Sequence, residues 1–321
     1  MTQMDAIILA GEKEGSIPVM GKNKALLSFR GRPLIRYVID AVDRAETINS
    51  ITIVGPRNKL ETELAGYKTE KPLNFLEQGR NIFENIWQGT VSTFPEYRPG
   101  ITSEELKGSP QADKAVVLLT CDMPMLEPLE IDRFVSAAPL DRADFVCGVT
   151  RHEMLEPYEP RGETPGIKFI YFCLRDRLIR HSNIFCMRPL KLAHVVEDFM
   201  PRVYNLRYQR HLRKVLSATA QFLWFFATRP GPLALFFLLE SASYCHNHNL
   251  HRLRQILRRP IELEWAERIT SEIFETRVAT LETIGPGPTL DVDDEESYNA
   301  FVAMYDKWKE MQLEQLKSAG I

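Results

Sequence analysis

The stretch MDAIILAGEKEGSIPVMGKNKALLSFRGRPLIRYVIDAV, residues 4–42, indicates the fold of the chain. Its apolar run at residues 6–10 predicts a buried strand, and Gly11 ends that run and opens a polar loop. A single lysine, Lys24, follows the loop, and an amphipathic helix is predicted at residues 33–45. Strand, loop and helix in this order leave two interpretations open: a loop that holds phosphate, or a long turn between two elements.

The same alternation continues through the first half of the chain. Further strands are predicted at residues 50–55, 115–120 and 143–149, further helices at 82–94 and 128–137, and an exposed polar excursion at 94–114. Short apolar strands that alternate with helices predict an α/β fold of three layers. Its sheet is expected to be mixed, mostly parallel, and covered by helices on both faces.

Composition and charge narrow the class of protein. The chain has 321 residues, of which 44% are hydrophobic and 26% charged, and a net charge of −3, which is ordinary for a globular protein. The first residues lack the basic segment of a signal peptide, and no apolar run reaches the roughly 20 residues of a spanning helix. Five cysteines stand singly, as is usual for reduced thiols. We therefore expect a cytoplasmic protein.

The second half of the chain differs in pattern and in charge. From about residue 189 to residue 282 the pattern is helical, and between Asp198 and Glu262 ten bases are accompanied by one acid, Glu240. A strand is predicted again at residues 277–284, and a helix is predicted after it, near the end of the sequence. We divide the chain into an α/β domain, residues 1–188 and 278–321, and a helical, basic insert, residues 189–277. The insert is expected to bind the acceptor or to face a membrane or a protein partner.

The most hydrophobic stretch of the chain lies in this insert, at residues 222–240. The sequence RPGP at residues 229–232 divides it into two runs that are too short to span a bilayer. One interpretation is a pair of core helices joined by a turn. The other is a surface pair that contacts a membrane through residues 202–259, peripherally at the inner face, with bases that suit anionic headgroups. The bases lack an interleaved aromatic platform, so nucleic acid is not an expected partner.

Three separated features carry candidate chemistry. Gly11 lets backbone N–H groups approach an anion, and Lys24 offers a point charge to a phosphate. In AVVLLTCDMP, Asp122 follows a strand at the end where α/β sheets bind ligands, and it suits a divalent cation on phosphate oxygens, although capping the next turn is an alternative. In TLDVDDEESYNAF, Asp291 and Asp293 are expected to leave a strand and precede a helix. Two strand-end carboxylates are what a magnesium ion on a triphosphate needs.

The order of these features, LAG…MG..K, then CDMP, then DVD..E, resembles the MobA-like NTP transferases. KALLSFRGRPLIRYVIDAV and SNIFCMRPLKL extend the resemblance, which covers roughly residues 1–188 and 278–310. It implies the GT-A-like, Rossmann-like fold of nucleotide-diphospho-sugar transferases. It also implies transfer of a nucleoside monophosphate from an NTP to a phosphorylated small-molecule or lipid-linked acceptor, with release of pyrophosphate.

The resemblance also implies roles for single residues. Ala10, Gly11 and the loop through Gly21 would wrap the triphosphate, and Lys24 would stabilise charge on its phosphates. The residues implied as ligands of Mg²⁺ (or Mn²⁺) are Asp122, Asp293 and, less strongly, Asp291. The residues implied for substrate recognition are Asn81 and Asn85 for the base and Asn183 for the acceptor. For Asn81, capping of a helix is an equal alternative.

The phosphate loop departs from the family pattern at two positions. The family loop usually reads LAGG with an arginine before MG, whereas this chain has Glu12 and Val19. Glu12 and Glu14 would repel a triphosphate unless a base such as Lys13, Lys22 or Arg30 compensates. Two alternatives to nucleotidyl transfer therefore stay open. One is a weakened nucleotide-binding or scaffold protein, and the other is a glycosyltransferase that uses DVD as its metal motif.

Overall fold

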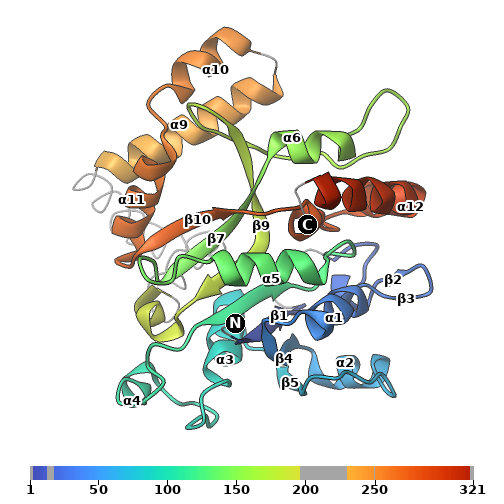
Figure 1. The fold of residues 1–321 in the computed structure, drawn as a ribbon, viewed down its shortest axis with the longest axis vertical. Coiled ribbons are helices and arrows are strands. Elements are labelled where there is room, and N and C mark those ends of the chain that lie inside the picture. The colour runs from blue at the N-terminus through green and yellow to red at the C-terminus, as the bar shows by residue number, and fades with distance from the viewer. Residues whose placement is uncertain (1–2, 13–17, 196–229, 249, 319–321) are drawn as a thin grey trace, which may run out of the picture.

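The computed structural model describes residues 3–12, 18–195, 230–248 and 250–318, and its centre is one eight-stranded sheet (Figure 1). Its strands are β1 (Met4–Leu9), β4 (Ile48–Gly55), β5 (Leu73–Glu77), β6 (Val116–Thr120), β7 (Phe145–Arg151), β8 (Phe172–Cys173), β9 (Leu178–Met187) and β10 (Val278–Glu282). The order is β10-β7-β9-β6-β1-β4-β5, and β8 pairs with β9. Only β9 runs against its neighbours, so the predicted mixed, mostly parallel sheet is confirmed.

Helices cover both faces of this sheet. The side chains of β1 alternate: Ala6 and Ile8 belong to a core shared with α1 (Leu34–Arg44) and α5 (Pro128–Ala137), whereas Ile7 packs on the opposite face with α3 (Ile82–Val91). Both faces of β1 are therefore buried, as expected for a central parallel strand. The predicted three-layer α/β/α arrangement is confirmed.

Several elements were not predicted from the sequence. They are the hairpin of β2 (Ser28–Phe29) and β3 (Arg32–Pro33), α2 (Arg57–Glu63), β5, α4 (Ser103–Leu106), α6 (His152–Leu155), β8 and β9. The 94–114 excursion thus contains one short helix, which begins with a capping box between Thr102 and Glu105. The described residues also contain short single turns: η1 (Lys24–Leu26), η2 (Glu156–Tyr158), η3 (Pro189–Lys191) and η5 (Gly287–Thr289).

Among the described residues between β9 and β10, three α-helices follow one another: α9 (Pro230–Asn247), α10 (His251–Arg258) and α11 (Leu263–Phe274). The prediction of a turn at RPGP was wrong, because residues 230–232 form the first turn of α9. Proline is tolerated there because the N–H groups of the first helical turn have no acceptor within the helix. The first half of the apolar stretch, residues 222–229, lies outside the described residues. Leu235 and Ala242 of α9 pack with Ile269 of α11 against β8 and β9, so these helices share a core with the sheet. The limits 189–277 of the insert stay a prediction.

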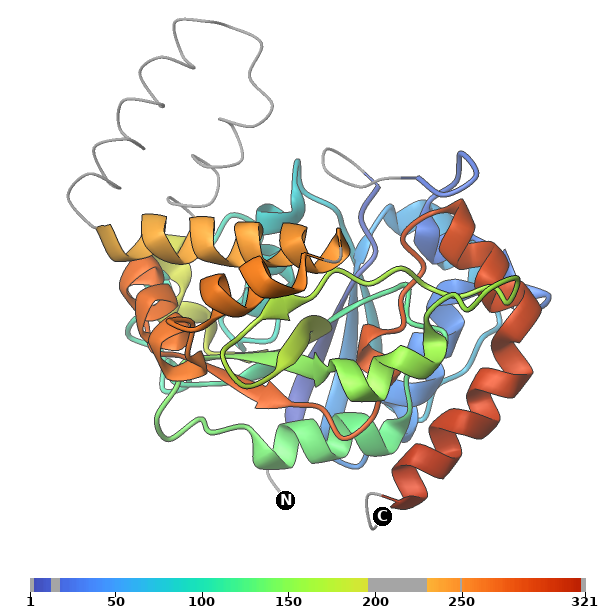
Figure 2. The ribbon, with the colours of Figure 1, turned by 90° about the horizontal axis from the view of Figure 1, so that it is seen from above.

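The last helix, α12 (Glu295–Ser318), closes the α/β part of the chain. Phe301 and Trp308 are fully buried in an aromatic core with Phe29 of the β2–β3 hairpin and Tyr158. α12 and α9 lie on opposite sides of the molecule (Figures 1 and 2). Among the described residues, no helix combines the length and the hydrophobicity needed to cross a membrane.

Candidate active site

The candidate site lies where β1 and β6 end side by side. These two strands are parallel neighbours, and Leu9 is paired with Thr120, so Gly11 and Asp122 leave the sheet at the same edge. Asp122 is buried, and the Thr120 hydroxyl donates a hydrogen bond of 2.6 Å to its Oδ1. The register of the sheet therefore places this carboxylate next to the N-terminal loop, as carboxyl ends of strands do in ligand sites of α/β proteins.

Two further carboxylates, Asp291 and Asp293, come from the segment between η5 and α12. The prediction that they directly follow a strand was wrong, because β10 ends at Glu282 and the turn η5 lies between that strand and the two aspartates. The backbone N–H of Val292 donates to the carbonyl of Asp122 (3.0 Å), which attaches this segment to the end of β6. One oxygen from each of the three aspartates lies within 4.8 Å of the others. Three carboxylates from two distant parts of the sequence thus converge on one point.

Buried hydroxyl groups hold the segment that carries Asp291 and Asp293. The Thr150 hydroxyl lies 2.6 Å from those of Thr283 and Thr289 and 2.9 Å from that of Ser182, and all four residues are buried. These bonds tie β7, β9 and η5 together. Because a buried polar group without a partner is costly, the network specifies one position for η5.

A buried carboxyl group supports the same segment from α5. The side chain of Glu130 accepts hydrogen bonds from the backbone N–H of Gly287 (2.8 Å) and from the side chain of Gln312 (3.2 Å) on α12. A Cβ on Gly287 would collide with this carboxyl group and would lie 2.7 Å from the Met125 carbonyl oxygen. Burial raises the pKa of Glu130 to about 7, against the opposing effect of the backbone N–H donors.

Lys24 neutralises part of the carboxylate cluster. Its Nζ lies 2.8 Å from Asp293 Oδ1 and 3.2 Å from Asp122 Oδ2. Asn23 fixes the turn before it: its side chain accepts from the Ala25 N–H (2.8 Å) and donates to the Ala10 carbonyl (3.1 Å). Burial alone would lower the pKa of the Lys24 ammonium, but the two aspartates outweigh it and the net pKa is raised. Asn23 was not predicted, although it stands directly beside Lys24.

The other side of the cluster is formed by β9. Asn183 Nδ2 donates to Asp291 Oδ2 (2.8 Å), and the guanidinium of Arg180 lies 3.3 Å from Asp291 and 3.6 Å from Asp293. Burial, followed by the charges of Asp293 and Asp122, raises the pKa of Asp291 to about 7, although Arg180 and Asn183 oppose this. Arg180 was missed because β9 itself was not predicted. Asn183 was predicted to face the acceptor, and in this structure it contacts the metal candidate Asp291.

The residues predicted to hold the nucleotide gather around Gly11. A Cβ at Gly11 would lie 2.6 Å from the side-chain nitrogen of Asn85, so any other residue here would displace that side chain. Asn85 is buried, and its Oδ1 accepts from the Gly79 N–H (2.7 Å). The side chain of Asn81 caps α3 by accepting from the backbone N–H groups of Phe83 and Glu84 (both 3.0 Å). The alternative of helix capping thus holds for Asn81, and the base-reading role of both asparagines stays a prediction.

The structure gives a physical reason for the two departures in the loop. Val19 is buried among Leu27, Phe29 and other members of the aromatic core, so this position faces away from a ligand. Met20 and Gly21 both have positive φ, 51° and 71°, in a turn closed by hydrogen bonds between Val19 and Lys22. Such a backbone favours glycine, which accounts for Gly21.

Glu12 is also accounted for. Its carboxylate lies 2.7 Å from Nζ of Lys59 on α2, and its backbone N–H donates to the Gln78 side chain. The compensating base is therefore Lys59, whereas Arg30, one of the predicted candidates, pairs with Asp306 on α12. Lys13 and Glu14 lie outside the described residues.

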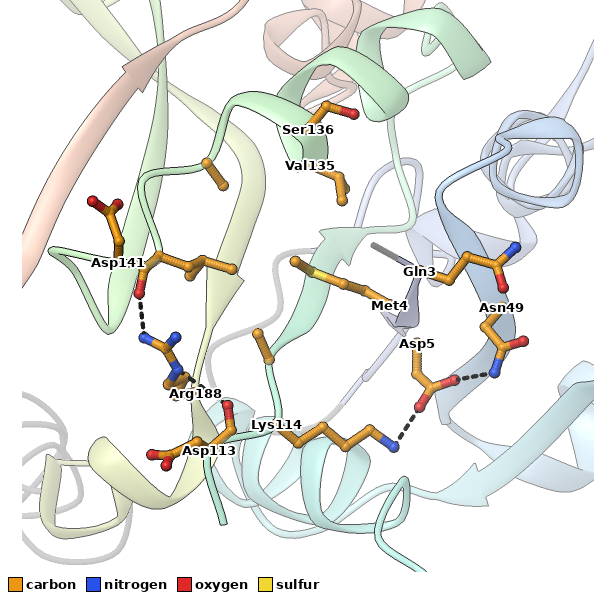
Figure 3. A pocket seen from close by; sticks show the side chains of 13 residues that line it. Gln3, Met4, Asp5, Asn49, Asp113, Lys114, Val135, Ser136, Asp141 and Arg188 are labelled. Carbon is orange, nitrogen blue, oxygen red and sulfur yellow. Dashed lines mark hydrogen bonds and ion pairs between the residues drawn. The ribbon is translucent and has the colours of Figure 1, made fainter. Parts of the chain in front are cut away.

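A cavity of about 870 Å³ lies away from this cluster, at the amino ends of β1, β4 and β6 (Figure 3). Three charged groups of its wall are held within the protein: Asp5 pairs with Lys114 (2.6 Å), and Arg188 donates to main-chain carbonyls and to Asp144. Most of the charge of this cavity is therefore already engaged, and the converging carboxylates mark the better site.

The sequence pattern of the MobA-like NTP transferase domain matches residues 6–222. The chain belongs to this family. This MobA-like NTP transferase is 29% identical over 91 residues to 2-C-methyl-D-erythritol 4-phosphate cytidylyltransferase of Lachnospira eligens. That match covers 26% of the chain and spans only 38% of the length of this curated relative.

Solved structures support the fold of this MobA-like NTP transferase. A hypothetical transferase from Thermus thermophilus superimposes with a TM-score of 0.55 at 23% identity, over 92% of this chain and all of that one. A 4-diphosphocytidyl-2C-methyl-D-erythritol synthase from Anaerococcus prevotii gives 0.48 at 11% identity, over 95% of this chain and 96% of that one. At these identities the first likeness shows the α/β fold alone, and the second is too low to add to it.

Proposed function

We propose that this chain is an active nucleotidyltransferase that moves a nucleoside monophosphate from an NTP to a phosphorylated small-molecule or lipid-linked acceptor and releases pyrophosphate. The observation that carries the proposal is the convergence of Asp122, Asp291 and Asp293 with Lys24 at the edge where Gly11 leaves β1. Negative and positive groups at one strand edge suit a polyphosphate with its cation.

The donor set fits a hard divalent cation. Three carboxylates offer only oxygen ligands, which Mg²⁺ and Mn²⁺ prefer, and two of the three are buried and therefore ordered by the core. Asp122, Asp293 and Asp291 would hold the ion. When bound, it supplies neutralisation of phosphate charge and polarises the phosphoryl oxygens.

The residues of the chain contribute position and charge. We assign the triphosphate to the backbone around Ala10, Gly11 and Gly21, and the charge that develops on it to Lys24. A phosphate oxygen of the acceptor forms a bond to the α-phosphorus as the bond from that phosphorus to the bridging oxygen of the β-phosphate breaks, and pyrophosphate leaves. We assign Asn183 to the acceptor side, where its bond to Asp291 also orients that carboxylate.

Two observations favour this reaction over the alternatives. A scaffold protein with a disabled loop was suggested by Glu12 and Val19, but Glu12 is neutralised by Lys59 and Val19 is a core residue. A glycosyltransferase with DVD as its metal motif does not require Lys24, yet here Asp293 of that motif pairs with this lysine of the N-terminal loop. A lysine at this place suits the additional phosphate charge of an NTP.

Pyrophosphate release tests the proposal. The full chain is incubated with Mg²⁺, each of ATP, CTP, GTP and UTP, and a panel of sugar, polyol and prenyl phosphates. One NTP is expected to give acceptor-dependent pyrophosphate, which Asp122→Ala abolishes and the exposed Asp141→Ala retains. Equal turnover in Asp122→Ala would contradict the proposal. Saturable NTP binding without turnover across the panel would favour the scaffold, and consumption of a sugar nucleotide without NTP would favour glycosyl transfer.

A further inference from the structure

The hairpin of α9 and α10 exposes an unusual amount of apolar surface. It lies at one end of the molecule's long axis (Figure 1). Eleven large hydrophobic side chains are exposed among the described residues, and six of them belong to this hairpin. They are Phe236, Phe237, Tyr244, Leu250, Leu253 and Ile256, with exposed fractions of 45–60%. This concentration on one hairpin distinguishes it from the scattered apolar side chains that any surface carries.

These side chains are additional to the core of the region. The inner face of α9 is already buried: Leu235 and Ala242 pack with residues of β8 and α11, and Cys245 is buried as well. On α10, Leu257 packs inward whereas Leu253 and Ile256 remain outside. The hairpin therefore has apolar groups on its outer side after its own fold is complete.

Positive charge accompanies the exposed apolar groups. α10 and the residue after it carry Arg252, Arg254, Arg258 and Arg259, while Glu240 is the only acid of residues 230–259. Arg252 and Arg259 are exposed and pair with no carboxylate among the described residues, whereas Arg254 and Arg258 are half-buried and Arg254 contacts the His246 ring nitrogen at 2.6 Å. By contrast, Arg175, near the same helices, pairs with Glu262. The hairpin thus combines exposed aromatic side chains with positive charge that the described protein does not neutralise.

We propose that the α9–α10 hairpin binds the surface of an anionic lipid bilayer. Aromatic and aliphatic side chains enter the interfacial region, and the exposed Arg252 and Arg259 lie at the level of the phosphate headgroups, which is how interfacial helices bind. The sequence that leads into α9 has the same composition, with Arg202, Arg207, Arg210, Arg213, Lys214, Phe222, Trp224, Phe225, Phe226 and Arg229. The complementary charge of anionic headgroups and the apolar layer beneath them match both properties of the hairpin at once. This inference does not rest on the proposed reaction.

Flotation of the full chain with vesicles tests the proposal. One set of vesicles contains phosphatidylcholine alone, and the other an equal mixture of phosphatidylcholine and phosphatidylglycerol. The chain is expected to float with the mixed vesicles, much less with the neutral ones, and less at high salt, because salt screens the attraction.

Matched pairs of variants locate the contact. Arg252→Gln with Arg259→Gln is expected to lower partitioning into the mixed vesicles by about 25-fold, since each base near the surface contributes about fivefold. The control is Arg133→Gln with Arg142→Gln, two exposed arginines on and after α5. Phe236→Ser with Phe237→Ser is compared with Val302→Ser and Leu313→Ser, which are similarly exposed on α12. Each control variant is expected to bind the mixed vesicles as the unchanged protein does. All variants are expected to have the thermal unfolding temperature of the unchanged protein.

Absence of the unchanged chain from the mixed vesicles would overturn the proposal. So would equal losses in the hairpin variants and their controls. A concentration-dependent dimer that forms without lipid and is broken by the hairpin substitutions, with no vesicle binding, would assign the surface to a second copy instead.

Discussion

Asp122 and Asp291 belong to one carboxylate cluster, but the chain places them in different ways. Asp122 follows β6 directly, and its position is set by the backbone ladder between β6 and β1. Asp291 follows a single turn that is held by buried side chains, chiefly Thr150 and Glu130, which come from two other elements. A strand end is fixed by many cooperative backbone bonds, whereas the loop depends on a few side-chain contacts.

The difference shows which half of the site is robust and which half is adjustable. The carboxylate of Asp122 can move only if a substitution disrupts β6, a central strand of the sheet. The segment with Asp291 and Asp293 can move when a single buried contact is lost, because it is attached through Gly287, Thr289 and the N–H of Val292. Each of these contacts can be changed without altering the sheet.

The largest effect is expected when the two carboxylates are neutralised in turn. Asp122→Asn should lower kcat by about a thousandfold or more, since it removes a proposed cation ligand and one of the two partners of Lys24. Asp291→Asn should lower it by only about tenfold, because Lys24 does not contact Asp291 and the amide oxygen can still accept the hydrogen bond from Asn183. Single-turnover pyrophosphate release measures both. Equal losses, or the reverse order, would show that the two carboxylates do not differ as described.

A smaller loss is expected when the loop is displaced without touching a carboxylate. Gly287→Ala places a methyl group against Glu130 and the Met125 carbonyl, so η5 must shift. A displacement of this kind typically costs about a hundredfold in turnover. The matched control is Gly108→Ala, where a Cβ meets nothing within 4 Å. Full activity in Gly287→Ala would show that the position of η5 is unimportant.

The support of the loop by Glu130 predicts a dependence of stability on pH. The pKa of this carboxyl group is raised from 4.5 to about 7 by burial, so the folded protein holds the proton more tightly than the unfolded chain. The resulting stabilisation is present below pH 4.5 and is lost as the pH rises through about 7.

Glu130→Gln lacks this titration. Relative to that variant, the unchanged protein should lose at most about 3 kcal/mol of unfolding free energy between about pH 5 and about pH 8. Urea denaturation at both values measures the difference. A difference that stays constant with pH would contradict the role of burial at Glu130.

The same contrast explains what the sequence could predict. The strand before Asp122, the glycine after β1 and Lys24 stand in contiguous patterns, so the α/β layers and these site residues follow from local signals. β9 was missed because Arg180, His181 and Asn183 interrupt its apolar pattern, and its place between β6 and β7 depends on pairings that are distant in sequence.

The neutralisation of Glu12 could not be predicted either, because Lys59 is 47 residues away on α2. The core position of Val19 and the hydroxyl network around Thr150 likewise depend on packing between elements that no local pattern links. Such tertiary contacts decide whether an unusual loop residue is harmful, and only coordinates reveal them.

Binding of Mn²⁺, followed by electron paramagnetic resonance, tests the central claim most directly. The claim is that Asp122, Asp291 and Asp293 form one cation site whose charge Lys24 balances. We predict that Asp122→Asn weakens Mn²⁺ binding, whereas Lys24→Met strengthens it by about tenfold in the absence of nucleotide, since a competing positive charge is removed. Equal Mn²⁺ affinity in the unchanged protein and both variants would contradict the account.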